Sequence, residues 1–560
     1  MARIGSKILF ITTSPRTPFR MIPEIELLNT HFAGNKWNTQ TQTAFMQLLR
    51  EENFFNGEGV NDPAFSARDR INRAPKALGF VTLSPVIGLT SAGQELIQTK
   101  RKEEIFLRQL LKFQLPSPYH KPTDKAVAFW VKPYLEIFRL IHHFGTLKFD
   151  ELMIFGLQLV DYRLFDSIVA KIEHFRMTKV QTKQNYKSFK NEYLTEELKI
   201  IYNTEIISGN TQTRESNNTS LTNFLQTKIN NMRDYTDALL RYLRATGMVN
   251  ISHVGKSISI ASEKIQEVNY FLKNTDREPS FIDDEKRYLE YLANHELPQL
   301  FIDDKDLLSA KIQDEFPYIK IDTALSMSEL KDILYDETAK RKDNIIAEQV
   351  SVIKDNYSLY NEINETFNQI ADKLLYDAPL VLEWNTWRAM TMLNGGQVTP
   401  NLKFDDFGNP MSTAQGNMAD IVCDYGDFGL TVEVTMQTGQ RQYEMEGESV
   451  ARHLAKLKKE TNKPSYCLFI APDINEACIA HFYALHKMNI SYYGGVSTIV
   501  PLPLNIFQKM ITDSYKTAYT PQPQQIKHFF ECSNEIAATS EDEKVWYQRI
   551  TTEALKWLGE

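Results

Sequence analysis

Cysteine and long apolar segments are both scarce in this chain. Only four of its 560 residues are cysteines, all in the last quarter, and they lack the CxxC spacing of zinc sites and the density of a disulfide framework. No uninterrupted apolar run approaches the roughly 18 residues of a membrane span. No charged segment followed by a long apolar one opens the chain. We therefore expect no signal peptide, no membrane span and a reducing, cytoplasmic environment.

Internal repeats and extended low-complexity tracts are also missing. The composition, with 42% hydrophobic and 24% charged residues, is ordinary for a soluble protein. Because 560 residues are too many for one core, several domains are expected.

The net charge of −8 hides an asymmetry between the two halves of the chain. Residues 1–275 contain 36 Lys and Arg against 26 Asp and Glu, whereas residues 276–560 contain 27 against 45. Phosphate binding depends on local charge, so a basic first half is compatible with a nucleic-acid partner. An acidic second half is expected where carboxylates collect a metal ion. A chance difference between the halves is the alternative.

Residues 1–275 predict short helices and two candidate winged-helix units. In the first, at 65–96, a helix leads into a strand, and Thr90 caps a second helix. In the second, at 234–260, a helix ends at Gly247 and two short strands follow. A helix with a β-wing often places a helix in the major groove of DNA. Modules of this kind also bind proteins, and that alternative stays open.

The rest of the chain predicts a helical segment followed by an α/β domain. Residues 276–377 are acidic and carry apolar side chains at helical spacing, which indicates a linker or a purely structural bundle. From residue 378 on, helices alternate with apolar strands such as 466–471. This alternation is typical of a mixed sheet covered on both faces. The expected organisation is thus 1–275, 276–377 and 378–560, in a multidomain α+β and α/β protein.

Three carboxylates of the last domain carry the clearest chemical signal. Asp420 precedes an apolar strand, Glu433 lies inside the next one, and Glu446 comes just before a basic helix. Buried carboxylates are costly unless they are paired or bound to metal. A hairpin from Asp420 to Glu433 brings two of them together, and all three can converge on one hard divalent cation. Such a cation polarises a phosphodiester and helps to deprotonate water.

Two further groups are candidates for the same site. The Val434 carbonyl is a natural additional oxygen ligand, and Glu383 lies on the helix that opens the domain. Glu383 completes the metal site, hydrogen-bonds to a ligand, or is a surface acid of its helix. For the other three carboxylates the alternative is that they are surface residues of a hairpin.

The layout of Asp420 with Glu433, Val434 and Thr435 resembles the nuclease core written PD-(D/E)XK. Thr435 replaces the signature lysine, so the general base stays unassigned, with Glu446 or a lysine of the following helix as alternatives.

Over essentially its whole length, the chain also resembles the AlwI-like family of type IIS restriction endonucleases, which includes PleI, MlyI and site-specific nicking endonucleases. The N-terminal segments that carry this resemblance are 13–18, 64–70, 106–114 with 116–117, 241–244 and 246–247. The C-terminal segments are 383–387, 414–417, 420, 433–435, 443, 445–446, 450, 452–453 and 466–472.

This resemblance implies a division of tasks along the chain. A winged-helix-like region reads the DNA, a helical linker follows, and a PD-(D/E)XK-like α/β nuclease domain cuts. The family's metal-site carboxylates fall on Glu383, Asp420, Glu433 and Glu446, with Mg²⁺ as the cofactor. The DNA-binding motifs contain Ser14, Arg16, Ser66, Arg68 and Arg70. Arginine suits this role because its planar fork binds guanine or phosphate bidentately, although exposed arginines also form plain surface ion pairs.

The function that follows is Mg²⁺-dependent cleavage of double-stranded DNA a few base pairs outside a short asymmetric site, leaving 5′-phosphate and 3′-hydroxyl ends. A strand-specific nicking enzyme, the large subunit of a heterodimeric enzyme and a non-cutting DNA-binding protein are the alternatives. Expected partners are double-stranded DNA, a transient second copy or a separate small subunit, and genetically a companion DNA methyltransferase. An enzyme of RNA or single strands fits less well, because no aromatic-rich β platform for bases is apparent.

Overall fold

The computed structural model describes residues 2–4, 6–52, 54, 62–123, 128–213, 215–253, 256–355, 357–414 and 416–558. They form two compact units, the first ending at Thr338 and the second beginning at Ala339. This boundary falls inside the segment 276–377, and helix α16 (Met327–Lys354) contains it. The division into three functional domains stays a prediction. Gln415, which contributes to the family resemblance, lies outside the described residues.

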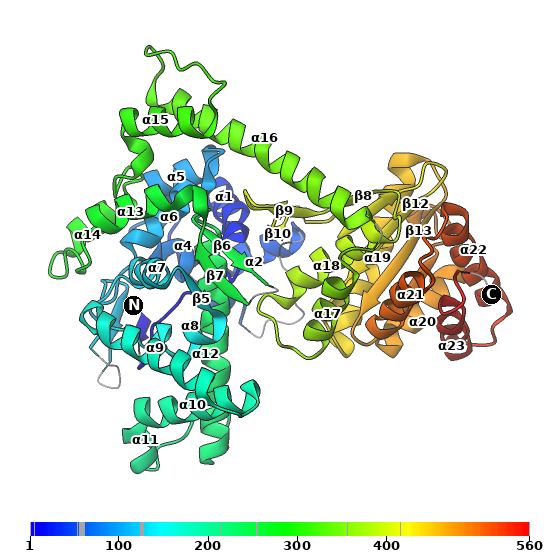
Figure 1. The fold of residues 1–560 in the computed structure, drawn as a ribbon, viewed down its shortest axis with the longest axis horizontal. Coiled ribbons are helices and arrows are strands. Elements are labelled where there is room, and N and C mark those ends of the chain that lie inside the picture. The colour runs from blue at the N-terminus through cyan, green and yellow to red at the C-terminus, as the bar shows by residue number, and fades with distance from the viewer. Residues whose placement is uncertain are drawn as a thin grey trace. The chain divides into compact units, whose positions relative to one another are not determined.

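The first unit is mainly helical (Figure 1). Its α-helices are α1 (Met21–Phe32), α2 (Thr39–Glu51), α3 (Pro63–Asn72), α4 (Ala74–Ala77), α5 (Ser91–Gln98), α6 (Lys102–Lys112), α7 (Pro133–Phe144), α8 (Phe149–Ile154), α9 (Phe165–Gln181), α10 (Tyr186–Ile201), α11 (Asn203–Ile207), α12 (Leu221–Arg244), α13 (Ile265–Asn274), α14 (Glu285–Ala293) and α15 (Lys305–Glu315). In the part of the chain that the structure covers, none of the helices has the length and apolarity to cross a membrane.

Short strands complete this unit. They are β1 (Ala2–Ile4), β2 (Val81–Thr82), β3 (Gly88–Leu89), β4 (His120–Pro122), β5 (Thr146–Lys148), β6 (Val249–Ser252) and β7 (Ser257–Ile260). They pair as β1 with β4, β2 with β3, and a three-stranded sheet in the order β5-β7-β6.

The helices and strands expected at 65–96 and 234–260 are present, although the first helix is divided between α3 and α4 and its strand belongs to the hairpin β2–β3. Thr90 caps α5 as predicted, because its hydroxyl accepts a hydrogen bond from Gly93 N at 3.0 Å. Gly93 is required there, since a Cβ would lie only 2.0 Å from the Phe80 carbonyl oxygen. In the second segment, β6 and β7 form an antiparallel hairpin after α12. The winged-helix assignment of both segments stays a prediction.

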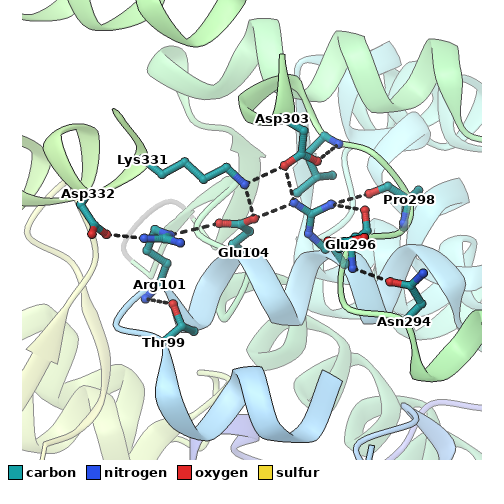
Figure 2. Close-up of polar contacts among 11 residues, drawn as sticks. Thr99, Arg101, Glu104, Asn294, Glu296, Pro298, Asp303, Lys331 and Asp332 are labelled. Carbon is teal, nitrogen blue, oxygen red and sulfur yellow. Dashed lines mark hydrogen bonds and ion pairs between the residues drawn. The ribbon is translucent and has the colours of Figure 1, made fainter. Parts of the chain in front are cut away.

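A buried network of ion pairs, made of Glu104, Arg108, Asp303 and Lys331, joins α6, the short helix at 301–303 and the first turns of α16 (Figure 2). Glu104 Oε1 accepts hydrogen bonds from Arg108 Nη2 at 2.6 Å and Lys331 Nζ at 2.8 Å. Asp303 Oδ1 accepts from the same two nitrogens at 2.8 and 2.6 Å. Two cations and two anions thus alternate, and we call this group the ion-pair network.

The second unit contains a five-stranded mixed sheet in the order β14-β13-β12-β11-β8. Its strands are β8 (Gln397–Pro400), β11 (Ile421–Asp424), β12 (Gly429–Val434), β13 (Ser465–Ala471) and β14 (Ile499–Pro503), and a separate hairpin pairs β9 (Leu402–Phe404) with β10 (Pro410–Thr413). The helices are α17 (Tyr360–Ala371), α18 (Ala378–Met392), α19 (Gln440–Thr461), α20 (Glu476–Lys487), α21 (Leu504–Thr517), α22 (Pro523–Thr539) and α23 (Glu543–Ala554).

The central strands of this sheet are covered on both faces, because every residue of β12 and β13 is buried. β12, β13 and β14 are parallel and are connected by α19 and α20, whereas β11 is antiparallel to both β12 and β8. This confirms the mixed α/β sheet expected from the alternation of helices and apolar strands.

Candidate active site

The hairpin β11–β12 brings Asp420 and Glu433 together, as predicted. Its register pairs Ile421 with Val432, so the next pair outward places Asp420 opposite Glu433. Asp420 Oδ2 accepts a hydrogen bond from Val434 N at 2.8 Å, which ties the residue before β11 to the end of β12. The Glu433 side chain is buried, at 5% exposure for the residue.

Helix α19 supplies Glu446, which is half-buried. The helix begins at the end of the turn that follows β12, so its first turns lie beside the carboxyl end of that strand. One helical face carries both Glu446 and His453, seven residues apart. His453 Nδ1 lies 2.9 Å from Glu433 Oε1. The Thr435 hydroxyl, at the place of the signature lysine, lies near the Glu446 carboxylate and partly offsets the rise of its pKa on burial.

Glu383 reaches the same group from α18. It is half-buried, and its Oε2 accepts a hydrogen bond from Thr413 Oγ1 of β10 at 3.3 Å. Its negative charge raises the pKa of Glu433. The four predicted carboxylates are therefore electrostatic neighbours, and we call them the carboxylate cluster.

The charges of the carboxylate cluster are not balanced by its surroundings. Burial raises the pKa of Asp420 well above its usual value, and the charge of Glu433 raises it further. Burial and then the charge of Glu446 raise the pKa of Glu433 well above its usual range. Burial likewise raises the pKa of Glu446. Burial and the nearby Arg452 lower the pKa of His453 to about 4, so this side chain is neutral at pH 7.

The composition of the cluster suits a hard divalent cation, which prefers carboxylate oxygens. His453 Nε2 is buried and has no hydrogen-bond partner among the described residues. One more atom that can bind a metal ion therefore lies beside the carboxylates. Across those residues, no three Asp, Glu, His or Cys side chains already have the mutual geometry of a metal site.

The first predicted DNA-binding motif is an exposed loop of the first unit. Arg16 is 46% exposed and lies 3.1 Å from Asp234 of α12 (Nη2–Oδ2). The loop is anchored at the two residues before this arginine: Tyr242 donates its hydroxyl hydrogen to the Pro15 carbonyl at 2.9 Å, and Ser14 O accepts from Ala74 N at 3.3 Å. Arg16 is thus held outward on an ordered loop.

The second motif is α3, where the two predicted arginines differ. Arg68 is 39% exposed and donates to Gln42 Oε1 at 2.8 Å. Arg70 is only 21% exposed and is paired through Nε with Oε2 of Glu24 at 3.1 Å, and Glu24 itself is 1% exposed. Ser66 is half-buried on the same helix. The structure therefore places Arg68 at the surface and gives Arg70 a structural partner.

Sequence reasoning missed the contact between His453 and Glu433 and the role of Gln442. The fully buried Gln442 side chain donates to the carbonyls of Gln437 and Asp473, both at 2.9 Å, and accepts from Asn475 N at 2.7 Å. It thereby joins the loops after β12 and β13. The seven-residue spacing from Glu446 could have indicated His453, whereas nothing in the sequence indicates Gln442.

Comparisons with known proteins identify the family. The sequence model of the AlwI restriction endonuclease family matches residues 76–510, which extend through all four carboxylates. No curated protein matches the chain.

Three solved structures show distant likenesses. The small subunit (R.BspD6I2) of the heterodimeric restriction endonuclease R.BspD6I is 24% identical, with 34% of this chain and 97% of that chain covered and a TM-score of 0.30. The BpuJ1 endonuclease binding domain, crystallised with modified DNA, is 16% identical, with 49% and 92% covered and a TM-score of 0.32. Restriction endonuclease FokI is 10% identical, with 83% and 82% covered and a TM-score of 0.21. All three TM-scores are too low to define the fold.

Proposed function

Because the chain belongs to the AlwI restriction endonuclease family, we propose that it is a type IIS enzyme that binds a short asymmetric site in double-stranded DNA and hydrolyses phosphodiesters a few base pairs outside it. The observation that carries the hydrolytic part is the carboxylate cluster, because buried acids with raised pKa values call for a cation. In this proposal the second unit contains a PD-(D/E)XK-like nuclease domain, and winged-helix-like segments of the first unit read the DNA.

Asp420, Glu433 and Glu446 would hold Mg²⁺, with the Val434 carbonyl as a further oxygen ligand and Glu383 completing or orienting the site. Bound Mg²⁺ supplies charge that polarises the phosphodiester and lowers the pKa of a water molecule. His453 would orient Glu433 through Nδ1, and the nearby Thr435 hydroxyl would favour the charged form of Glu446.

The reaction is the in-line attack of a water oxygen on phosphorus. A new P–O bond forms as the bond between phosphorus and the 3′ oxygen breaks. The attacking water loses a proton, and the leaving 3′ oxygen gains one. The products are a 5′-phosphate and a 3′-hydroxyl.

For DNA recognition, we propose that Arg16 and Arg68 contact the duplex, with Ser14 and Ser66 in the same motifs. Arg70 would act indirectly, because its ion pair with the buried Glu24 holds α3 in place. Arg16→Ala and Arg68→Ala are then expected to weaken site-specific binding without changing stability, whereas Arg70→Ala lowers stability as well. An Arg70→Ala variant that binds weakly but unfolds like the wild type would contradict this assignment.

The decisive experiment incubates the purified protein and Mg²⁺ with unmethylated plasmid, and sequences the ends on both strands. Glu433→Gln is expected to reduce cleavage by more than the roughly 100-fold typical of outer-shell changes at metal sites. The exposed neighbour Glu444→Gln is the matched control and is expected to cut normally. Discrete breaks at a fixed distance from one short motif, lost only in Glu433→Gln, support the proposal.

The same sequencing separates the alternatives. Breaks in one strand only would identify a nicking enzyme or one that needs a second subunit. Duplex binding without Mg²⁺-dependent breaks, in the wild type as in Glu433→Gln, would identify a non-cutting DNA-binding protein and overturn the proposed chemistry.

A further inference from the structure

A basic stretch without carboxylates joins α9 to α10 in the first unit. Residues 174–191 contain five Lys or Arg and no Asp or Glu. Lys179, Lys183 and Lys187 are exposed, and none of them lies within 4.0 Å of a carboxylate among the described residues. These three lysines, which we call the lysine turn, therefore have no ion-pair partner within the described structure.

The other two basic residues of this stretch take part in the fold. Arg176 pairs with the buried Glu151 at 2.7 Å (Nε–Oε1), and Lys190 pairs with Asp150 at 3.3 Å. Arg176 and Lys190 thus hold α9 and α10 against α8, whereas the lysine turn faces solvent.

The lysine turn is held in an ordered position. Tyr186, the first residue of α10, donates its hydroxyl hydrogen to Asp150 Oδ2 at 2.9 Å. Lys179 Nζ lies 4.5 Å from the centroid of the Tyr186 ring, so the end of α9 is held against the first residue of α10. Asn185 Oδ1 accepts a hydrogen bond from Lys187 N at 2.8 Å and fixes the start of α10.

We infer that the lysine turn is a contact surface for the phosphate backbone of double-stranded DNA, separate from the motifs that read bases. This inference rests on the proposed function. Lysine is a flexible point charge that suits phosphate, and backbone contacts position a protein on DNA without specifying sequence. Three exposed cations within nine residues, none with a carboxylate partner among the described residues, are available to a polyanion.

The expected effect is a change in salt dependence. Each phosphate neutralised on B-DNA contributes about 0.9 to the slope of log K against log salt, so replacing three lysines lowers the slope by about 2.7. Between 50 and 200 mM salt, the wild type would then lose about 40-fold more affinity than the variant. Binding to specific and unrelated duplexes should weaken equally, and the cut position should stay the same.

The experiment measures duplex binding by the full chain across this salt range, for the wild type and for Lys179→Gln, Lys183→Gln and Lys187→Gln combined. The matched control combines Lys273→Gln, Lys286→Gln and Lys305→Gln, which removes the same charge from exposed lysines elsewhere in the first unit. Equal unfolding temperatures establish that both variants are folded.

A slope reduced only in the first variant supports the inference. An unchanged slope, or an equal reduction in both variants, overturns it. If the wild type binds and cuts duplex DNA normally but its salt slope equals that of the lysine variant, this inference is wrong and the proposed function stands. A wild type that neither binds nor cuts duplex DNA would remove the proposed function, and this inference with it.

Discussion

The two units each contain a buried group of charged side chains, and the two groups differ in balance. The ion-pair network of the first unit alternates two anions with two cations at 2.6–2.8 Å. The carboxylate cluster of the second unit contains four acids, and its neighbouring histidine is neutral at pH 7. The first group satisfies itself, whereas the second leaves its negative charge uncompensated, and the proposed function supplies it with an external cation.

The pKa directions express this difference. Burial alone would raise the pKa of Glu104 and of Asp303, but Arg108 and Lys331 outweigh it and lower both pKa values. In the carboxylate cluster the same burial, reinforced by like charges, raises the pKa of Asp420 and Glu433. Buried charge is therefore evidence of a functional site only where the fold leaves it uncompensated.

The largest effect is expected from breaking the balanced group. Asp303→Asn leaves Arg108 and Lys331 with one anion between them and should lower the free energy of unfolding of the first unit by about 3 kcal/mol. Urea unfolding measures this loss. Asp306→Asn, at an exposed position three residues further on, is the control and should change stability by less than about 0.5 kcal/mol. Equal stability of the two variants would show that the network contributes nothing.

Mg²⁺ should raise the free energy of unfolding only of the second unit, which contains the carboxylate cluster. At a concentration about 100 times the dissociation constant, binding to the folded state raises the free energy of unfolding by about 2.7 kcal/mol. This gain should be absent in Glu433→Gln and intact in Asp303→Asn, as measured by calorimetry with and without Mg²⁺. A gain that persists in Glu433→Gln would place the cation elsewhere.

Replacing an acid by its amide should change the free energy of unfolding in opposite directions in the two groups. In EDTA, Glu433→Gln removes a buried charge that lacks compensation and should raise stability by on the order of 1 kcal/mol. The glutamine oxygen can still accept a hydrogen bond from His453. Urea unfolding beside Asp303→Asn provides the comparison, and a loss of stability in both variants would contradict the proposed imbalance.

The smallest expected effect is the pH dependence of these differences. The folded pKa of Asp303 is lowered, so the penalty of Asp303→Asn is complete above the unfolded pKa of about 3.9 and fades only as pH falls below it. The folded pKa of Glu433 is raised, so the gain from Glu433→Gln should fade earlier, at pH values above about 4.3. Free energies of unfolding measured from pH 7 to pH 4 test this difference, because the gain from Glu433→Gln should fade within this range and the penalty of Asp303→Asn should not.

Local patterns predicted the elements that carry the site. The apolar residues around Glu433 indicated a strand, and the turn residues before it indicated the hairpin that places Asp420 opposite. Thr90 indicated the cap of α5. Such features depend on side chains close in sequence, so they can be predicted from the sequence alone.

Partners that are distant in sequence were not predictable in this way. Arg70 and Glu24 are 46 residues apart, and the sequence left open whether this arginine faces DNA or another side chain. Lys331 and Glu104 are 227 residues apart, and neither residue type indicates the other. The boundary between the two compact units at Thr338, inside the segment 276–377, was not predicted either.

The sequence by itself determined the family, the mixed sheet and the acids of the candidate site, because motifs, apolar periodicity and side-chain chemistry are properties of neighbouring residues. Only the tertiary structure decided which charges are compensated. It paired Glu104 and Asp303 with cations, gave Arg70 a buried partner, and left Asp420, Glu433 and Glu446 together without enough positive charge. Electrostatic balance depends on distance and burial in space, and only packing sets those.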